Sequence, residues 1–290
     1  MSTSNQQLVE RFQKDGFVVL ENALTDSQLS SLNSELSMWV EESRGNEKPY
    51  GKIMDGRPRF DIQVDTHSSE SPALRRITSP AEISQVCLDV VKDNKALDLV
   101  SEIFSPNIKH WTNKINLKLP GSGTEVKFHQ DFPYEPHSNE DIMTVLFFLD
   151  DVTLENGPLE VVPGTHNGPL HSLWHDGIFT GAVSAEIEAE CKTNAISCEG
   201  KAGTACLMHS KLLHGSKPNN SKTPRCLFIV SYTAEDAVKL TENPLPSELD
   251  GMIVRGKETG TVRCTSYSVE LPEYPQEVSF FDQQSKMKDI

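Results

Sequence analysis

Two histidines and one aspartate form the most specific chemical pattern in this chain of 290 residues. His129 and Asp131 are two residues apart, and on a strand such residues project from the same face. One imidazole and one carboxylate can then converge on a single ion, and His214 is the candidate for a third ligand from another strand. Two histidines and a carboxylate leave the remaining positions of the ion open, which suits ferrous iron in oxygenases.

The His-x-Asp pair alone is weak evidence, because hydrogen-bonded surface pairs of this kind are common. Arg225 adds to it, since this residue begins an otherwise apolar run, CLFIV. A guanidinium in such a place needs an anion, which it can bind through two parallel hydrogen bonds, and the hydroxyl of Ser216 can donate another. The alternative is a salt bridge between Arg225 and one of the many acidic residues.

The elements that must position these residues are predicted as helices followed by strands. Helices are expected near 6–14, after the Thr25–Gln28 capping box, after a second capping box at Ser79–Glu82 with Pro80 at the first helical position, and over 94–104. A strand is expected at 17–20. From about residue 108 short strands dominate, which favours a sandwich or jelly roll. The predicted strands are 114–119, 144–149, 159–162, 203–209 and 225–232, and the strand at 114–119 places Lys114, Asn116 and Lys118 on one face.

Charge and cysteine usage limit the partners and the compartment. The formal net charge is −15, which argues against nucleic acid or an anionic membrane surface as a partner. No apolar run approaches the roughly 20 residues that span a bilayer, and the polar start MSTSNQQ is not a signal peptide. The six cysteines contain no CxxC pair. They are typical of reduced thiols, so we expect a cytoplasmic protein.

The sequence resembles the phytanoyl-CoA dioxygenase family of 2-oxoglutarate oxygenases, which are built on a double-stranded β-helix. The matching motifs keep the family's order over most of the first 230 residues, and the resemblance fades beyond Tyr232. The motifs are Phe12-Gln-Lys-Asp-Gly-Phe17, His129-Gln130-Asp131, Glu155-Asn-Gly-Pro-Leu159, Val162-Pro-Gly-Thr-His166, His214-Gly-Ser216 and Arg225.

This resemblance implies a mostly β jelly roll (cupin-like) with flanking helices. It implies one oxygenase domain over 1–290, made of a mainly helical scaffold (1–107), a β-helix core (108–232) and a C-terminal extension packed on the core (233–290). It also implies Fe(II), with 2-oxoglutarate and O2 as cosubstrates. The implied iron ligands are His129, Asp131 and His214, and the implied cosubstrate contacts are Arg225, Ser216, Lys114, Asn116 and Gln130. The related halogenases lack the carboxylate, so Asp131 favours hydroxylation or another ordinary oxidation.

The substrate is expected to be a small polar or anionic metabolite. Two segments are candidates for recognising it: a basic loop over 51–60 and an insertion over 167–200 that could form a lid. The candidate substrate residues are Arg57, Arg59, Tyr134, His137, Trp174 and Arg255. We expect a monomer or homodimer. Two rival functions stay open, a cupin-like zinc hydrolase or isomerase, which gives Arg225 and Ser216 no task, and a binding barrel without catalysis.

Overall fold

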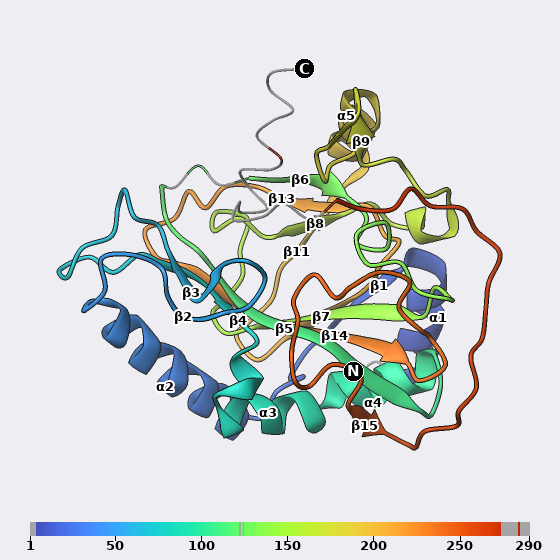
Figure 1. Cartoon of the computed structure of the whole chain (residues 1–290), viewed down its shortest axis with the longest axis horizontal. Helices are drawn as coiled ribbons and strands as arrows, with labels where there is room; N and C mark the ends of the chain where they lie inside the picture. Colours follow the sequence, from blue (N-terminus) through green and yellow to red (C-terminus); the bar gives the residue numbers. More distant parts are fainter. Residues whose placement is uncertain (1–3, 122, 124, 274–283, 285–290) are drawn as a thin grey trace.

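The computed structural model describes residues 4–121, 123, 125–273 and 284. Within them two antiparallel sheets lie one above the other, and helices cover the outer side of the larger sheet (Figure 1). The larger sheet comprises β1 (Phe17–Leu20), β2 (Tyr50–Ile53), β3 (Pro58–Ile62), β4 (Leu74–Thr78), β5 (Ile108–Lys118), β7 (Ile142–Phe148), β12 (Ala205–His209), β14 (Arg225–Ala234) and β15 (Ile253–Arg255). The smaller sheet comprises β6 (Val126–His129), β8 (Leu159–Val161), β11 (Ile196–Cys198) and β13 (His214–Ser216).

The two sheets form the expected jelly roll. The order β12-β7-β14-β5 in the larger sheet faces the order β11-β8-β13-β6 in the smaller one. Every pairing is antiparallel, and most of the predicted strands lie within one or two residues of the observed ones. The predicted fold class, mostly β with flanking helices, is confirmed.

Along β14, alternate side chains face the space between the sheets and the main core. Successive side chains of a strand point to opposite faces, and β14 is buried on both. Its residues that line the space between the sheets are Arg225, Leu227, Ile229 and Ser231. Those that pack into the main core, beneath the helices, are Cys226, Phe228, Val230 and Tyr232. Each large apolar side chain buried in this way contributes about 1.5–3 kcal/mol, which holds the strand in register.

Helices α1 (Asn5–Asp15), α2 (Asp26–Ser43), α3 (Gln85–Lys92) and α4 (Lys95–Ile103) pack along the outer side of the larger sheet (Figure 1). The capping box of α2 is present as predicted, with the Thr25 hydroxyl accepting from the Gln28 N–H and the Gln28 side chain accepting from the Thr25 N–H. The helix predicted over 94–104 is also confirmed, with Asn94 as its N-cap. No helix in the described residues has the length and apolar character that crossing a membrane requires.

The capping box predicted at Ser79 is wrong. Residues Pro80–Glu82 form a single 3₁₀ turn, and Ser79 has a φ of 49° with no side-chain cap. The amide oxygen of Asn113 accepts a hydrogen bond from the Ala81 N–H instead, at 3.0 Å. The following helix, α3, is capped by Ser84. A side chain from β5 thus replaces the local cap, which the local sequence could not indicate.

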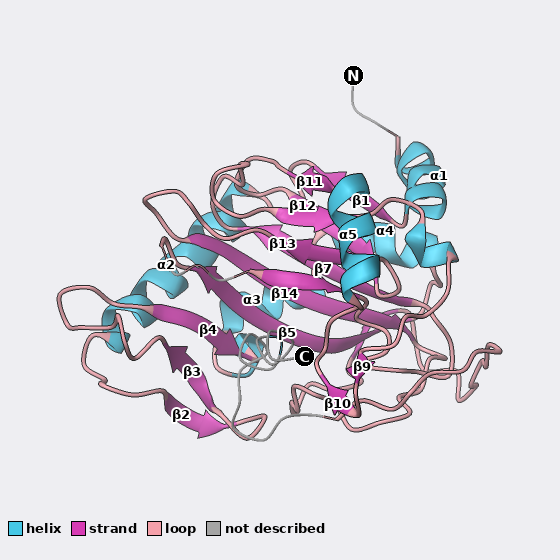
Figure 2. Ribbon diagram, turned by 90° about the horizontal axis from the view of Figure 1, so that it is seen from above, coloured by secondary structure: helices cyan, strands magenta, loops and turns pink. Residues whose placement is uncertain are grey.

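The basic segment predicted as a loop over 51–60 is a hairpin. Strands β2 and β3 pair, and the rings of Tyr50 and Phe60 stack at 4.7 Å between centroids. Strand β4 joins this hairpin to β5, so the larger sheet extends well beyond the jelly roll (Figure 2). The segment predicted as a mainly helical scaffold therefore supplies four strands as well as helices. The division at 107 and 232 stays a prediction.

Most of the insertion over 167–200 lies on the outside of the smaller sheet, and its last part forms β11, an edge strand of that sheet. It also contains the hairpin β9 (Trp174–His175) and β10 (Ile178–Phe179) and helix α5 (Ala185–Asn194), and α5 is seen in front of the strands in Figure 2. Its apolar side chains form a separate small core with Phe128 and Leu213. Of the predicted C-terminal extension, residues 274–283 and 285–290 lie outside the described residues. Within the described residues of that extension, β15 pairs with β5.

Candidate metal centre and cosubstrate cavity

His129 and His214 come from neighbouring strands of the smaller sheet. His129 is the last residue of β6, His214 is the first of β13, and the two are paired across the sheet. Asp131 follows in a tight turn, in which its carbonyl accepts from the Tyr134 and Glu135 N–H groups. The assumption that His129 and Asp131 share one strand is therefore wrong, because β6 ends at His129. The turn still brings the carboxylate back over the two rings.

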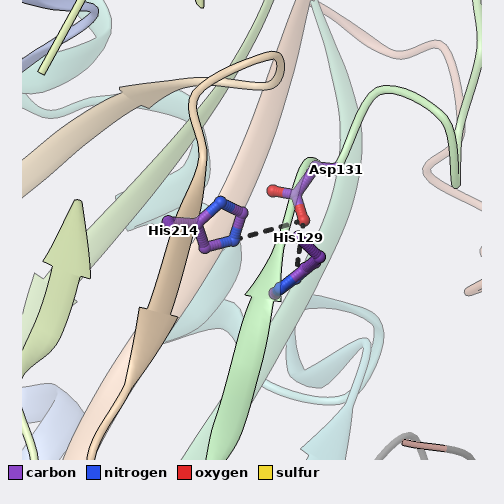
Figure 3. Close-up of side chains that lie close together, drawn as sticks. All are labelled: His129, Asp131 and His214. Carbon is purple, nitrogen blue, oxygen red and sulfur yellow. Dashed lines mark ion pairs between the residues drawn. The ribbon is translucent and has the colours of Figure 1, made fainter. Parts of the chain in front are cut away.

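The three side chains converge on one point (Figure 3). One ligand atom from each of them lies within 4.8 Å of the other two. Oδ1 of Asp131 is 3.5 Å from Nε2 of His129 and 3.6 Å from Nε2 of His214. In each ring Nδ1 is 2.9 Å from a backbone carbonyl, that of Lys127 or Leu212. With Nδ1–H donating to those carbonyls, both Nε2 lone pairs point toward the carboxylate, as metal-ligating histidines require.

Electrostatics favour the charge states that bind a metal. Burial lowers the pKa of His214 to about 4, so its ring is neutral at pH 7. Burial by itself would raise the pKa of Asp131, but the rings of His214 and His129, together with Lys114, hold it well below its usual range. Thr144 Oγ1 also donates to Asp131 Oδ2 at 3.2 Å. Neutral imidazoles and an ionised carboxylate are the forms that ligate divalent ions, so the residues present fit ferrous iron.

A cavity of about 300 Å³ opens between the two sheets beside these ligands. Its wall is formed mainly by β5, β14 and β7 on one side and by β6 and β13 on the other, and residues of β3, β4 and the preceding turn complete it. The sequence-predicted residues that line it are His129, Asp131, His214, Arg225, Ser216, Lys114, Asn116, Arg57 and Tyr134. Most of the predicted site is therefore brought together around one space.

One end of the cavity holds two cations without a carboxylate. Arg225 is only 4 % exposed, donates to the Gly157 carbonyl at 2.6 Å, and leaves its buried Nε without a partner among the described residues. It forms no ion pair with any residue that the structure describes, so the salt-bridge alternative finds no support. Opposite it on β5, Lys118 donates to Ser216 Oγ at 2.6 Å and to the Lys217 carbonyl. Such a group of donors can hold a carboxylate.

The unpaired cations at this end have lowered pKa values. Burial lowers the pKa of Arg225 to about 10, and burial together with Arg225 lowers the pKa of Lys118 to about 7. Each cation would regain its ordinary affinity for protons if an anion bound between them. The end of the cavity at Arg225 is thus suited to bind a negatively charged group.

Gln130 does not reach this cavity. Its amide nitrogen donates to the carbonyls of Pro169 and Lys211, and its amide oxygen accepts from the His171 N–H at 2.8 Å. The side chain is fully buried and ties two loops together. The expectation that it contacts the cosubstrate fails because Gln130 points away from the face that carries His129 and Asp131.

Four of the predicted substrate residues also lie away from the cavity. Arg59 is buried against the Glu82 carboxylate, and His137 packs edge-on against Trp111 with 4.7 Å between ring centroids. Trp174 packs on the ring of Phe179 in the insertion, outside the smaller sheet. Arg255 is paired with Asp98 on α4 at 2.9 Å, on the helix-covered side. Arg59, His137, Trp174 and Arg255 therefore have structural partners of their own.

The predicted lid is likewise not found over the cavity. Within the described residues, no side chain of the insertion 167–200 contributes to the cavity wall. The insertion contacts neighbours of the site, through the hydrogen bonds of Pro169 and His171 with Gln130 and through the contact of Phe179 with Tyr134 at 5.0 Å between ring centroids. Its Pro, Gly and aromatic content is that of a loop, and the sequence did not indicate which face of the sheet it covers.

Charged cavity residues that the sequence did not assign to the site include Lys118, Arg76 and Glu135. Lys118 shares the predicted face of Lys114 and could have been chosen from that alternation. Arg76 gave no signal, because β4 was not predicted. Glu135 lines the cavity and accepts from the Trp111 indole at 2.5 Å. Burial and the nearby Asp131 raise the pKa of Glu135 to about 8.

Fold, ligand set and cationic pocket together define the class of non-haem iron(II), 2-oxoglutarate-dependent dioxygenases. The model of the phytanoyl-CoA dioxygenase family (PhyH) matches residues 12–226, and the chain belongs to this family. Fe(II) and 2-oxoglutarate are accordingly its cofactor and cosubstrate.

Individual relatives agree with this assignment. The chain is 33 % identical over 206 residues to a probable alpha-ketoglutarate-dependent hypophosphite dioxygenase of Stutzerimonas stutzeri, covering 70 % of this chain and 71 % of that protein. It is 26 % identical to an L-proline trans-4-hydroxylase of Streptomyces griseoviridis, with 77 % and 84 % covered. The fold matches EctD from S. alaskensis, solved with 2-oxoglutarate and 5-hydroxyectoine, at a TM-score of 0.63 and 21 % identity over 91 % and 87 % of the two chains.

Proposed function

We propose that His129, Asp131 and His214 hold the ferrous ion of this dioxygenase. We further propose that it oxidises a C–H bond of a small polar or anionic metabolite. The observation that carries the assignment is the convergence of two Nε2 atoms and one carboxylate oxygen beside a cavity whose far end is cationic. A zinc hydrolase would need the same ligands but would give no task to Arg225, which is buried without an ionic partner among the described residues.

Arg225, Lys118 and Ser216 would hold the distal carboxylate of 2-oxoglutarate. The planar guanidinium can meet that carboxylate with two hydrogen bonds, and the Lys118 ammonium adds a third donor. Bound iron with 2-oxoglutarate and O2 supplies the oxidising power and leaves succinate and CO2. The chain positions the reactants, keeps the cavity dry and chooses the substrate.

The relatives support a small substrate. They are named for hypophosphite, L-proline and ectoine, each of which is far smaller than a peptide or a nucleic acid. A cavity of about 300 Å³, part of which 2-oxoglutarate would fill, leaves room for a molecule of this size. Cytoplasmic location and a monomeric or homodimeric state remain part of the proposal, and sedimentation of the purified protein would test the latter.

An anaerobic titration tests the function. Protein reconstituted with iron(II) is expected to develop a weak visible charge-transfer band when 2-oxoglutarate is added, and zinc-loaded protein serves as the control. Absence of the band from folded, iron-loaded protein would contradict the proposal. Succinate release on adding O2 and candidate substrates would then separate an enzyme from a barrel that only binds.

The affinity for 2-oxoglutarate should depend on pH through Lys118. In the free protein its pKa is about 7, and a bound carboxylate would raise that value. Binding therefore takes up a proton above pH 7, and the apparent affinity should fall between pH 7 and 9, by at most about tenfold per pH unit. Calorimetric titrations in buffers of different ionisation enthalpy measure both effects. In Lys118→Met the affinity should be weaker, and this pH dependence should vanish.

A further inference from the structure

We propose that Lys114, Arg76 and Arg57 form a second anion subsite in this cavity, which binds the oxyanion group of a small substrate, a carboxylate or a phosphorus oxyanion. This inference rests on the proposed function, because it assigns the region of the cavity that 2-oxoglutarate leaves free. It replaces the expectation that Lys114 contacts the cosubstrate.

The subsite is separated from the cosubstrate end by the geometry of β5. Lys118 pairs with Arg225 and Lys114 pairs with Ile229, and both lysines lie on the same face of the strand. Four residues of antiparallel strand span about 13 Å. Lys114 also acts electrostatically on Asp131 and Glu135, whereas Lys118 acts on Arg225. Lys114 thus lies near the metal ligands, at a distance from Arg225 along β5.

Strand β4 and the turn before β3 bring two guanidinium groups to the same place. Arg76 is the cross-strand partner of Asn116, and Thr78 is that of Lys114, so Arg76 lies on the cavity face next to Lys114. Arg57 also lines the cavity. The extension of the larger sheet by β2, β3 and β4 therefore supplies two of the three cations of this subsite.

These cations are not neutralised by the described residues. Arg57 and Arg76 share the single carboxylate of Asp55, at 2.5 Å and 3.2 Å. The side-chain ammonium of Lys114 forms neither a hydrogen bond nor an ion pair with any described residue, and the buried Nε atoms of both arginines lack partners there as well. The neighbouring Arg75 is matched by Asp61 at 2.8 Å.

A positive surplus remains at this end of the cavity when Lys114 is protonated. Among the described residues, the cavity wall has four carboxylates. Asp61 pairs with Arg75 and Asp131 is the metal ligand, which leaves Asp55 and Glu135 to face the subsite. The three cations of the subsite then face two carboxylates, those of Asp55 and Glu135, even when Glu135 is ionised. In a chain with a formal net charge of −15 this local surplus is a feature of the site rather than of the composition. Guanidinium and ammonium groups in a cavity wall bind carboxylate or phosphorus oxyanions strongly.

The size of the cavity limits what carries the oxyanion. Its volume of about 300 Å³ is shared with 2-oxoglutarate, so the substrate must be a small molecule. An oxyanion held at Lys114 would place the adjoining atoms of the substrate beside His129, Asp131 and His214. Binding of the oxyanion would thus select the bond that is oxidised.

The experiment uses the anaerobic protein loaded with iron(II) and saturating 2-oxoglutarate. Acetate and phosphite are titrated separately, with acetamide as the neutral counterpart of acetate, and the charge-transfer band is followed. We expect a saturable change of the band with acetate or phosphite and none with acetamide. A response to acetate alone would assign a carboxylate, and a response to phosphite alone a phosphorus oxyanion.

Variants identify the residues. Lys114→Met should weaken binding of the oxyanion by about thirtyfold or more, because it removes one partner of a buried charge pair. Arg76→Gln should act in the same direction, and it serves as the second variant if Lys114→Met does not fold. Lys201→Met is the matched control, since Lys201 is 87 % exposed and pairs with Asp151 on the surface.

Any one of several results would overturn the subsite. The first is that Lys114→Met binds the oxyanion as well as the unchanged protein does. The second is that acetamide changes the band as much as acetate does. The third is that the oxyanion effect is lost as the 2-oxoglutarate concentration is raised. This third result would show that the oxyanion and 2-oxoglutarate compete for the end of the cavity at Arg225. A band that ignores both oxyanions would also refute it, whereas a missing band would refute the proposed function itself.

Discussion

Iron-dependent turnover of 2-oxoglutarate should disappear in Asp131→Ala. The carboxylate is the single anionic ligand at the candidate centre, with Oδ1 about equally far from both Nε2 atoms. Loss of a partner that only orients a ligand lowers metal affinity or activity about 10- to 100-fold. Loss of the ligand itself should therefore lower iron affinity by more than about a hundredfold. Iron retained after dialysis, the charge-transfer band and succinate release measure the effect.

Thr144→Val is the matched control for that prediction. It removes the hydroxyl that donates to Asp131 Oδ2 but leaves all three ligands in place. We expect a loss of no more than about 10- to 100-fold, with the band preserved at higher iron concentration. If Asp131→Ala bound iron as well as the unchanged protein did, the assignment of Asp131 as a ligand would be wrong.

Arg225→Met should raise the KM for 2-oxoglutarate by about thirtyfold or more. Truncating one partner of a buried, hydrogen-bonded charge pair costs about 2–5 kcal/mol. The effect should fall mainly on KM, because the distal carboxylate is held in the same way before and during the reaction. Initial rates of succinate release at increasing 2-oxoglutarate measure this change.

Thermal unfolding provides the control for Arg225. Without 2-oxoglutarate its guanidinium is buried and forms no ion pair within the described residues, so the methionine should leave the melting temperature nearly unchanged. A residue that made a structural ion pair would instead cost about 3–5 kcal/mol when removed. A large drop in melting temperature with an unchanged KM would therefore show that Arg225 is structural. Arg225→Lys keeps the charge and should give an intermediate KM.

The sequence determined the elements with strong local signals. The Thr25 capping box, the Asn94 helix start, the alternation of polar and apolar residues in β5 and the apolar run of β14 are set by hydrogen bonds or by side-chain types within a few residues. The alternation in β5 placed Lys114 on one face with Asn116 and Lys118, whereas Arg225 was singled out because it begins an apolar run. The motif order also named the family, and with it iron and 2-oxoglutarate.

Only the tertiary structure decided which residues share the cavity. Arg76 lines the cavity because β4 pairs with β5. Arg59 does not line it, because its guanidinium pairs with the carboxylate of Glu82, which lies in a turn farther along the chain. Pairing between distant segments is not encoded in local periodicity. Short strands such as β2, β3 and β4, with register shifts, give no clear pattern of their own.

The His-x-Asp pair illustrates the same division. Its residue types and their match with His214 were readable from the sequence, since metal chemistry restricts which side chains serve as ligands. Two features followed only from the packing of the surrounding loops. Asp131 lies in a turn beyond β6, and Gln130, between the ligands, points into two loops. Local sequence fixes residue chemistry and strand faces, whereas long-range contacts fix which side chains meet, because they depend on segments far apart in the chain.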